Sequence, residues 1–308
     1  MDRREQISIL KRTLLRDVVS LFQRPDVQWR SGIAAMACDL KKLAVPAVIF
    51  GGTLRSLMLG RLARTPRFGR PRDLDIVVAN ANMETLRERL QQHVVRQTRF
   101  GGLQLQRSDW HFDLWPVDQT WAIVHDQELE ANFQTLPRTT FFNLEAIAVD
   151  LWAEPGRRRA IYSGDDRFFE GLIDRTLEIN LEDNPFPALC VVRSLVFAST
   201  TRFWMGPRLA HYLTAHREVV GESELEAIQH QHYGEIRVSR SEMRTWLNHV
   251  AAAHERAPQE RVKLPMTGPL TLWDDEVDFT PRLFSHAATS QPTSVQGRGR
   301  VEHARNPD

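Results

Sequence analysis

The sequence predicts an α+β protein in which a mixed-sheet head is followed by an all-helical part. Over roughly the first 160 residues, short apolar runs of strand length alternate with helical patterns. From about residue 165 onward, apolar residues recur almost throughout at helical spacing. The chain contains no run of 18 or more apolar residues, which argues against a transmembrane helix.

Four segments are expected along the 308 residues. N-terminal helices occupy 1–44, the head 45–160 and the helical part 161–284, and a disordered tail covers 285–308. The tail is rich in Ser, Thr, Gln, Gly, Arg and Pro, a composition typical of disorder.

The N-terminal segment predicts two helices. Apolar residues recur at helical spacing over 4–23, and Pro25 ends that pattern. A second helical pattern runs from about 29 to 44. Pro46 then introduces the first strand.

The head begins with a strand, a turn, a helix and a second strand. Residues 47–50 form a buried apolar strand, and Gly51-Gly52 lets the backbone turn tightly. A helix over 53–60 follows, and after a basic loop with two prolines the second apolar strand spans 73–78. The segment from about 82 to 93 again has helical spacing.

The rest of the head predicts a hairpin and two shorter elements. Strand patterns at 99–106 and 110–117 flank a turn at 107–109. Residues 120–124 form another element, and residues 141–152 allow a helix. The helices expected in the C-terminal part cover 168–179, 187–200, 205–216, 222–231 and 239–254.

Two aspartates open the second strand of the head. Residues i and i+2 of a strand point to the same face, so Asp73 and Asp75 project together, about 7 Å apart along the strand. Asp113, on a later strand, supplies a third carboxylate if the two strands are neighbours. Carboxylates beside a glycine turn at a helix N-terminus can hold divalent metal ions against a phosphate chain. The ordered set predicts a site for nucleotidyl transfer, and the three carboxylates are expected to converge within about 4 to 6 Å.

The amino-acid composition limits the kinds of partner and the cellular location that we expect. The net charge of +1 argues against nonspecific nucleic-acid binding by the whole chain. All but four of the 40 basic residues are arginine, which suits bidentate phosphate recognition, although genomic base composition would produce the same bias. The two cysteines, Cys38 and Cys190, are expected to be buried free thiols. With a charged N-terminus, these features favour a cytoplasmic protein that does not bind membranes.

Four segments resemble motifs of the poly(A) polymerase/CCA-adding enzyme group, the class II tRNA nucleotidyltransferases. Residues 48–61 and 72–77 are similar to its Gly-Gly-x-Val-Arg-Asp-x-Leu-Leu-Gly and Asp-x-Asp motifs. Residues 139–150 echo its Arg-Arg-Asp-Phe-Thr-x-Asn-Ala-Leu-Ala-x-Asp motif, and residues 184–198 echo the arginine-rich neck motif. The resemblance implies a nucleotidyltransferase-fold head and a helical neck. It also implies Mg²⁺- or Mn²⁺-dependent transfer of a nucleoside monophosphate from an NTP, with an RNA 3′ end as acceptor.

The chain also departs from these motifs. Ser56 stands where the group has Asp, and residues 139–141 replace Arg-Arg-Asp, with one arginine displaced to Arg138. In the neck motif only Arg193 remains of the arginines. The metal carboxylates are kept while most groups that select the nucleotide are lost, which argues against a standard CCA-adding or poly(A)-adding enzyme.

The sequence therefore predicts a divergent nucleotidyltransferase. The predicted catalytic and metal-binding residues are Asp73, Asp75 and Asp113, and the predicted nucleotide-binding residues are Gly51, Gly52, Arg55, Arg138 and Arg193. A transferase acting on a protein or a small molecule, and a catalytically inactive binding protein, remain open. The sequence names neither the NTP nor the oligomeric state.

Overall fold

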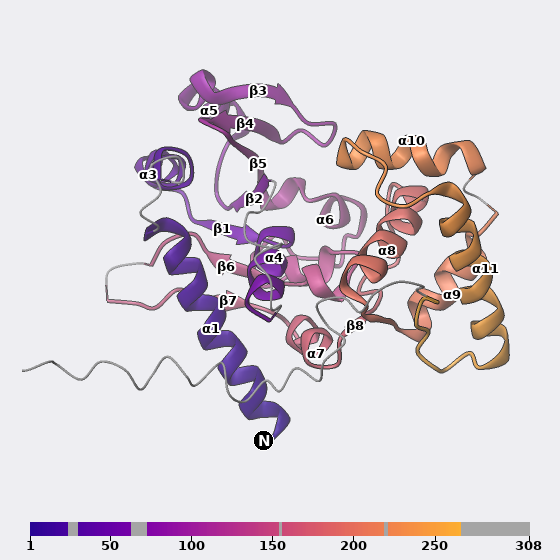
Figure 1. Cartoon of the computed structure of the whole chain (residues 1–308). Helices are drawn as coiled ribbons and strands as arrows, with labels where there is room; N and C mark the ends of the chain where they lie inside the picture. The colour runs from indigo at the N-terminus through magenta and orange to yellow at the C-terminus, as the bar shows by residue number, and fades with distance from the viewer. Residues whose placement is uncertain (24–29, 63–72, 154–155, 219–220, 266–308) are drawn as a thin grey trace, which may run out of the picture. The chain divides into compact units, whose positions relative to one another are not determined.

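The computed structural model describes residues 1–23, 30–62, 73–153, 156–218 and 221–265 (Figure 1). These residues belong to a compact unit spanning Met1–Val277. Most of the predicted basic loop and the whole predicted tail lie outside the described residues, and the division into four segments remains a prediction. No helix among the described residues is long and apolar enough to cross a membrane.

The head is built on a seven-stranded mixed sheet with strand order β3-β4-β5-β2-β1-β6-β7. Its strands are β1 (Ala47–Phe50), β2 (Asp73–Val78), β3 (Val94–Gln97), β4 (Leu103–Arg107), β5 (Trp110–Pro116), β6 (Ala148–Asp150) and β7 (Ile161–Tyr162). Strands β2 and β5 are parallel, whereas the other neighbouring pairs are antiparallel. A mixed sheet with helices confirms the predicted α+β class.

Helices pack around this sheet and then continue as a helical C-terminal part, salmon to orange in Figure 1. They are α1 (Arg3–Gln23), α3 (Ala35–Lys42), α4 (Gly52–Leu62), α5 (Met83–Arg89), α6 (Trp121–His125), α7 (Arg167–Ile173), α8 (Pro187–Thr201), α9 (Pro207–Ala215), α10 (Glu222–Tyr233) and α11 (Arg240–Arg256). A π-helical turn, η1 (Arg30–Ala34), precedes α3, and a small parallel pair joins β8 (Thr176–Leu177) to β9 (Trp204–Met205).

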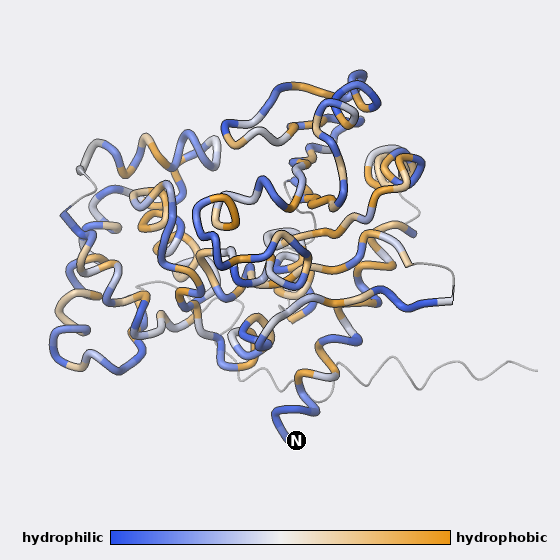
Figure 2. The backbone as a smooth tube through the Cα atoms, turned by 180° about the vertical axis from the view of Figure 1, so that it is seen from behind, coloured by the Kyte–Doolittle hydropathy of each residue, from blue (hydrophilic) through white to orange (hydrophobic). Residues whose placement is uncertain are grey.

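The alternation of side chains along β2 positions the site. Leu74 and Ile76 are fully buried on the sheet face that α4 covers, and α1 packs in turn on α4. Asp73, Asp75 and Val77 point to the opposite face. There Val77 enters an apolar cluster under α6, while the aspartates lie at the start of the strand. Figure 2 shows hydrophobic stretches running along the central strands.

Ion pairs hold α1 against the head. Asp17 is buried and accepts a hydrogen bond from Arg61 Nε at 3.0 Å, which fastens the end of α4. Near the middle of α1, Lys11 pairs with Asp166 at 2.8 Å. The predicted first helix is therefore an integral support of α4, the helix that follows the glycine turn.

The expectation of a helix over 141–152 is wrong. The segment forms a short 3₁₀ helix, η6 (Asn143–Glu145), followed by strand β6, which pairs with β1. A short apolar run fits a buried strand as well as a helix, and periodicity cannot separate the two. Pairing with β1 decides the outcome.

Other expectations need smaller corrections. Strand β3 was not predicted, and residues 98–102 form the turn between β3 and β4. Helix α7 ends at Ile173, and β8 follows it. Cys38 is exposed, because it lies on the outer side of the short helix α3, whereas Cys190 is buried as expected.

Gly171 on α7 permits the close packing of α7 against η6. A Cβ atom at this position would lie 2.3 Å from Asn143 Nδ2 and 3.0 Å from Leu144 Cδ2. The Asn143 side chain donates to the Thr176 carbonyl at 3.0 Å and accepts from the Leu144 and Glu178 amides, so it has little freedom to move.

We expect Gly171→Ala to lower the free energy of unfolding by about 1–3 kcal/mol through this overpacking. Denaturant titration of the purified variant measures the change. Gly52→Ala is the matched control, since the atoms nearest to a Cβ there are 3.7 Å away. Equal stability of the two variants would contradict the packing assigned to Gly171.

Candidate active site

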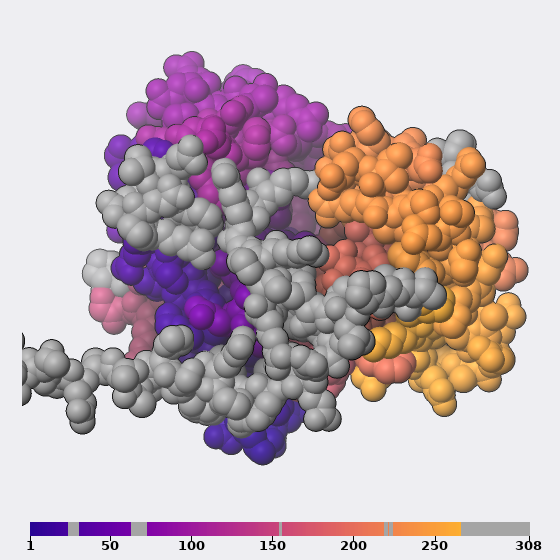
Figure 3. All heavy atoms as spheres, viewed as in Figure 1, coloured from indigo at the N-terminus to yellow at the C-terminus, as the bar shows by residue number. Residues whose placement is uncertain are grey.

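One pocket brings together seven of the eight predicted site residues. It has a volume of about 530 Å³ and lies between the head and helices α8 and α10. Figure 3 shows a recess between the β3–β5 region and α10. The predicted residues that line the pocket are Gly51, Gly52, Arg55, Asp73, Asp75, Asp113 and Arg193.

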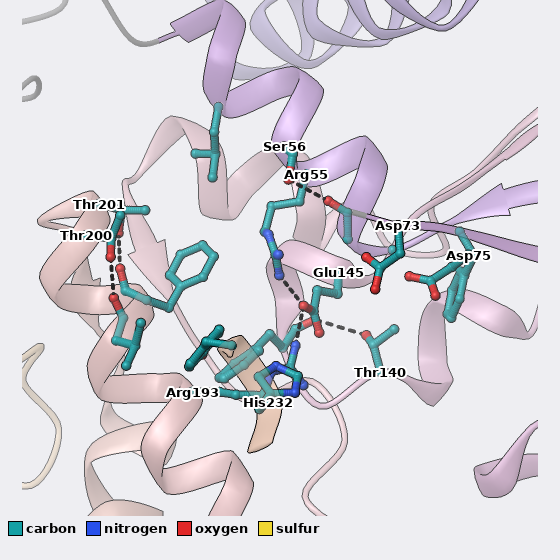
Figure 4. Close-up of a pocket in the computed structure, with 18 of the residues that line it drawn as sticks. Arg55, Ser56, Asp73, Asp75, Thr140, Glu145, Arg193, Thr200, Thr201 and His232 are labelled. Atoms are coloured by element: carbon teal, nitrogen blue, oxygen red, sulfur yellow. Dashed lines mark hydrogen bonds and ion pairs between the residues drawn. The ribbon is translucent and has the colours of Figure 1, made fainter. Parts of the chain in front are cut away.

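The carboxylates come from two neighbouring strands. Strands β2 and β5 pair in parallel with Asp75 directly opposite Asp113, so both side chains lie on one sheet face. The register therefore places Asp113 beside Asp75, and the roles expected for the three carboxylates stay predictions. Gln104 Nε2 donates to Asp113 Oδ1 at 3.3 Å. In Figure 4, the Asp73 and Asp75 carboxylates face each other.

The three carboxylates do not form a complete metal cage. Among the described residues, no group of three or more His, Cys, Asp or Glu side chains is placed to hold a metal ion. The donors nevertheless fit Mg²⁺, a hard cation that takes oxygen ligands and is commonly held by one or two carboxylates together with substrate phosphates. Asp73 and Asp75 are the pair that fits this mode.

The glycine turn is tied to both neighbouring strands. Gly51 has φ +57°, a left-handed conformation that favours glycine, and its amide donates to the Ile147 carbonyl at 3.0 Å. The Thr53 hydroxyl in the first turn of α4 donates to the Asp73 carbonyl at 2.9 Å. The start of α4 therefore keeps a set position relative to the carboxylates.

The missing side chain of Gly52 leaves a hollow beside the turn. A Cβ atom on Gly52 would lie 3.7 Å from both Arg55 Nη2 and Asp75 Oδ2. A guanidinium nitrogen and a carboxylate oxygen therefore both border this hollow, and Gly52, Arg55 and Asp75 all line the pocket. It lies at the N-terminus of α4, where unpaired amides and the helix dipole favour an anion.

A buried carboxylate, Glu145, links the two arginines of the pocket. Arg193 Nη2 donates to Glu145 Oε1 at 2.5 Å, and Arg55 Nη1 donates to the same oxygen. Figure 4 shows both guanidinium groups pointing at this carboxylate. Burial alone would raise the pKa of Glu145, but the charges and hydrogen bonds of Arg193 and Arg55 hold that pKa below its ordinary value.

The same arginines stack across the boundary between the head and α8. Arg55, from the head, lies over the ring of Phe197 on α8, 5.2 Å from its centroid. Arg193, from α8, lies over the ring of Phe142 next to η6, again at 5.2 Å. These reciprocal contacts hold α8 against the glycine-turn helix.

The end of α10 and the residues after it form the remaining wall. His232, Tyr233 and Arg237 line the pocket, and the Arg237 guanidinium lies over the Tyr233 ring, 4.3 Å from its centroid. Burial raises the pKa of the Tyr233 hydroxyl, against the lowering effect of Arg193 and Arg237.

The sequence analysis did not predict four residues of the pocket: Glu145, His232, Tyr233 and Arg237. Glu145 carried a usable signal, because it is a charge inside the apolar run Leu144–Val149, and a buried charge needs a partner. Its place in the motif of residues 139–150 is that of the group's Asn. The α10 residues carried no comparable signal, since a helix and the loop after it reach the pocket only through tertiary packing.

Arg138 and Ser56, at which the chain departs from the motifs, differ in their placement relative to the main pocket. Arg138 does not line this pocket; it lines a second one together with Arg167 and Asn180. Ser56, which stands where the resembled group has Asp, lines the main pocket, but its hydroxyl donates to the Gly52 carbonyl within α4 at 2.9 Å.

Comparison with known proteins gives matches among solved structures alone. No family model matches the chain, and no curated protein does. Similar structures include a tRNA-processing enzyme in an apo form (16% identity, TM-score 0.47) and a tRNA nucleotidyltransferase complexed with a primer tRNA and an incoming ATP analog (17%, 0.48). The Thermotoga maritima CCA-adding enzyme complexed with tRNA matches at 14% identity and a TM-score of 0.42.

These matches cover 73%, 72% and 72% of this chain and 55%, 61% and 57% of the other chains, respectively. The chain therefore spans less than two thirds of the length of the proteins it matches.

The ionised state of Glu145 should show in the pH dependence of stability. Its lowered pKa means that its stabilising contribution is present above the ordinary glutamate pKa of about 4.3 and is lost as the pH falls through the lowered value. We expect wild type to lose stability relative to Glu145→Gln as the pH falls below about 4. Denaturant titration at a series of pH values measures this.

Glu178 is the matched control, because burial raises its pKa despite the amide hydrogen bonds it accepts. Its contribution has the opposite sign, so wild type should gain stability relative to Glu178→Gln as the pH falls. A parallel response of the two variants would refute the assignment of the lowered pKa to Glu145.

Proposed function

We propose that this protein is a metal-dependent nucleotidyltransferase that moves a nucleoside monophosphate from an NTP to an acceptor hydroxyl. The observation that carries the proposal is the hollow beside Gly52, bounded by Arg55 Nη2 and Asp75 Oδ2. A phosphate chain needs cationic donors on one side and a metal held by carboxylates on the other, and this hollow supplies both kinds of group.

The triphosphate would lie along the glycine turn. Backbone amides at the start of α4 point toward the phosphates, and Arg55 donates to them from the side. Arg193 adds a second positive charge from α8. Together these groups orient the α-phosphate toward the carboxylates of β2.

Asp73 and Asp75 would hold Mg²⁺, or Mn²⁺ in its place. When bound, the metal polarises the phosphoryl oxygens and neutralises the charge that develops on the leaving pyrophosphate. The protein contributes the position of the two carboxylates, which the Thr53 bond to the Asp73 carbonyl sets against the glycine turn.

Asp113 is proposed to serve the acceptor. It lies beside Asp75 on the parallel strand β5 and lines the same pocket. Its carboxylate can accept the proton of the attacking hydroxyl while that oxygen bonds to the α-phosphorus and the bond to pyrophosphate breaks. Gln104 holds the Asp113 carboxylate through its Oδ1 atom.

The acceptor is proposed to be an RNA 3′ end, as the motif resemblance implies. A protein or small-molecule acceptor would use the same chemistry, and the assay below separates them. The domains proposed are the head at 45–160, which carries the carboxylates, and the helical part at 161–284, which supplies the opposite wall.

Transfer should depend on both β2 carboxylates. Incubating the protein with each α-labelled NTP, Mg²⁺ and total cell extract, followed by separation of RNA, protein and small molecules, identifies the labelled fraction. We expect labelled RNA with wild type. In Asp73→Asn and Asp75→Asn we expect labelling to fall about 100-fold or more, because metal binding contributes several kcal/mol to such reactions.

Asp118→Asn is the matched control, since Asp118 is exposed and lies outside the pocket. If label appears in protein or in small molecules, the acceptor is not RNA, but the proposed transfer chemistry still holds. Absence of Mg²⁺-dependent NTP consumption by wild type would favour the inactive binding protein over the transferase.

Gly52→Ala tests the hollow without disturbing the fold. A methyl group fits at 3.7 Å from its nearest neighbours, and alanine is the better helix former by up to about 1 kcal/mol. We expect unchanged or slightly raised stability together with at least about 10-fold weaker NTP binding, because the methyl group occupies the proposed phosphate position. Thermal denaturation and equilibrium NTP binding measure the two quantities, and unaltered binding would contradict the proposed phosphate position.

A further inference from the structure

We propose that Glu145 is a positioning residue that orients Arg55 so that its free edge faces the phosphate hollow. This inference rests on the proposed nucleotidyl transfer and names a residue for which the motif resemblance implies no role. The guanidinium of Arg55 contacts two different neighbours through its two terminal nitrogens.

Each terminal nitrogen of Arg55 has its own neighbour. Nη1 donates to Glu145 Oε1, while Nη2 borders the hollow beside Gly52. A guanidinium is planar, so fixing one nitrogen and the plane of the group fixes the direction of the other. The ring of Phe197, over which Arg55 lies, restricts that plane. Glu145 and Phe197 therefore determine where Nη2 points.

The backbone around Glu145 is fixed by hydrogen bonds to neighbouring segments. Glu145 ends the turn η6, and its amide donates to the Phe142 carbonyl at 3.1 Å. The preceding Asn143 side chain is bound to the Thr176 carbonyl and the Glu178 amide, which anchors η6 to the segment around β8. The Glu145 Cβ and carbonyl also lie within 4 Å of a Cβ position on Gly51, next to the turn.

Arg193 completes the arrangement from α8. It donates to the same Glu145 oxygen at 2.5 Å, so a single carboxylate carries two guanidinium groups from different parts of the fold. The three side chains together have a net charge of +1. The cluster remains cationic toward a phosphate while the two arginines, which repel each other, are kept close together.

Because Glu145 is negatively charged, the opposite interpretation is that Glu145 competes with phosphate for the two arginines. Against this, an arginine has five donors, and the two bonds to Glu145 occupy one nitrogen of each guanidinium. Nη2 of Arg55 lies at the hollow while Nη1 is bound, so the carboxylate and a phosphate need different donors. The two interpretations predict opposite couplings between Glu145 and Arg55.

A double-mutant cycle measures that coupling. The quantity is the ratio of affinities for an NTP and for the corresponding nucleoside, measured by equilibrium binding with ATP and adenosine, GTP and guanosine, CTP and cytidine, and UTP and uridine. The ratio isolates phosphate contacts and does not depend on the fraction of folded protein. The variants are Arg55→Ala, Glu145→Gln and the double variant, with Glu145→Asp as a second variant that keeps the charge but shortens the reach.

We expect Arg55→Ala to lower the ratio by on the order of 10-fold in the wild-type background, the effect of one charge-assisted hydrogen bond. In the Glu145→Gln and Glu145→Asp backgrounds the same change should lower it less than about 3-fold, because the guanidinium is no longer aimed at the hollow. An equal or larger effect of Arg55→Ala in those backgrounds would overturn the positioning role and identify Glu145 as a competitor of phosphate.

Glu178→Gln is the control for a general effect on the interface. Glu178 is a mostly buried carboxylate that accepts hydrogen bonds from the amides of Arg208 and Leu209 at the start of α9, outside the pocket. Its change should leave the ratio and the effect of Arg55→Ala unaltered. Coupling of Glu178 to Arg55 as strong as that of Glu145 would mean a merely structural role, and the proposal would fail.

Failure of the inference differs from failure of the proposed function. Wild type that binds no NTP overturns both. Wild type that binds NTP more tightly than nucleoside, with no coupling between Arg55 and Glu145, overturns only the positioning role.

Discussion

The pocket depends on one carboxylate shared by two arginines. Glu145 belongs to the head, and its partners Arg55 and Arg193 come from α4 and α8. Neither arginine could be half-buried without a counter-charge, since an unpaired buried charge is costly. The triad thereby joins the glycine turn, the segment before β6 and the helical part at one point. The stacking of each arginine on a phenylalanine of the opposite side adds to this link.

The sheet arranges the other half of the site. Because β2 and β5 are parallel and in register, Asp75 and Asp113 lie side by side although they are 38 positions apart in the chain. Alternation along β2 keeps Leu74 and Ile76 in the core and sends the aspartates to the pocket. Apolar burial on one face of a strand thus holds the polar groups on its other face in position.

Where the chain lacks arginines of the resembled motifs, other residues line the pocket. The arginines missing from residues 139–141 and from the start of α8 are not replaced by other cations from the same segments. Instead, cationic and aromatic groups reach the pocket from the end of α10, where Arg237 lies over Tyr233. Glu145 occupies the motif position of an asparagine and binds two arginines that the motifs do contain. The pocket therefore contains the glycine turn and the β2 aspartates of the resembled motifs, and it differs from those motifs in the residues that the helical part contributes.

The sequence alone determined the α+β class, the glycine turn with its helix and the two aspartates of β2, because these features follow from local periodicity and from residues close in the chain. It also placed Asp113 on a strand with the correct face. Tertiary structure decided the rest. The segment 141–152 became η6 and β6 because β1 offered a partner, Arg138 was carried to another pocket, and Glu145, His232, Tyr233 and Arg237 entered the site through packing. Contacts between distant segments leave no period in the sequence, so only the folded chain shows which charges meet.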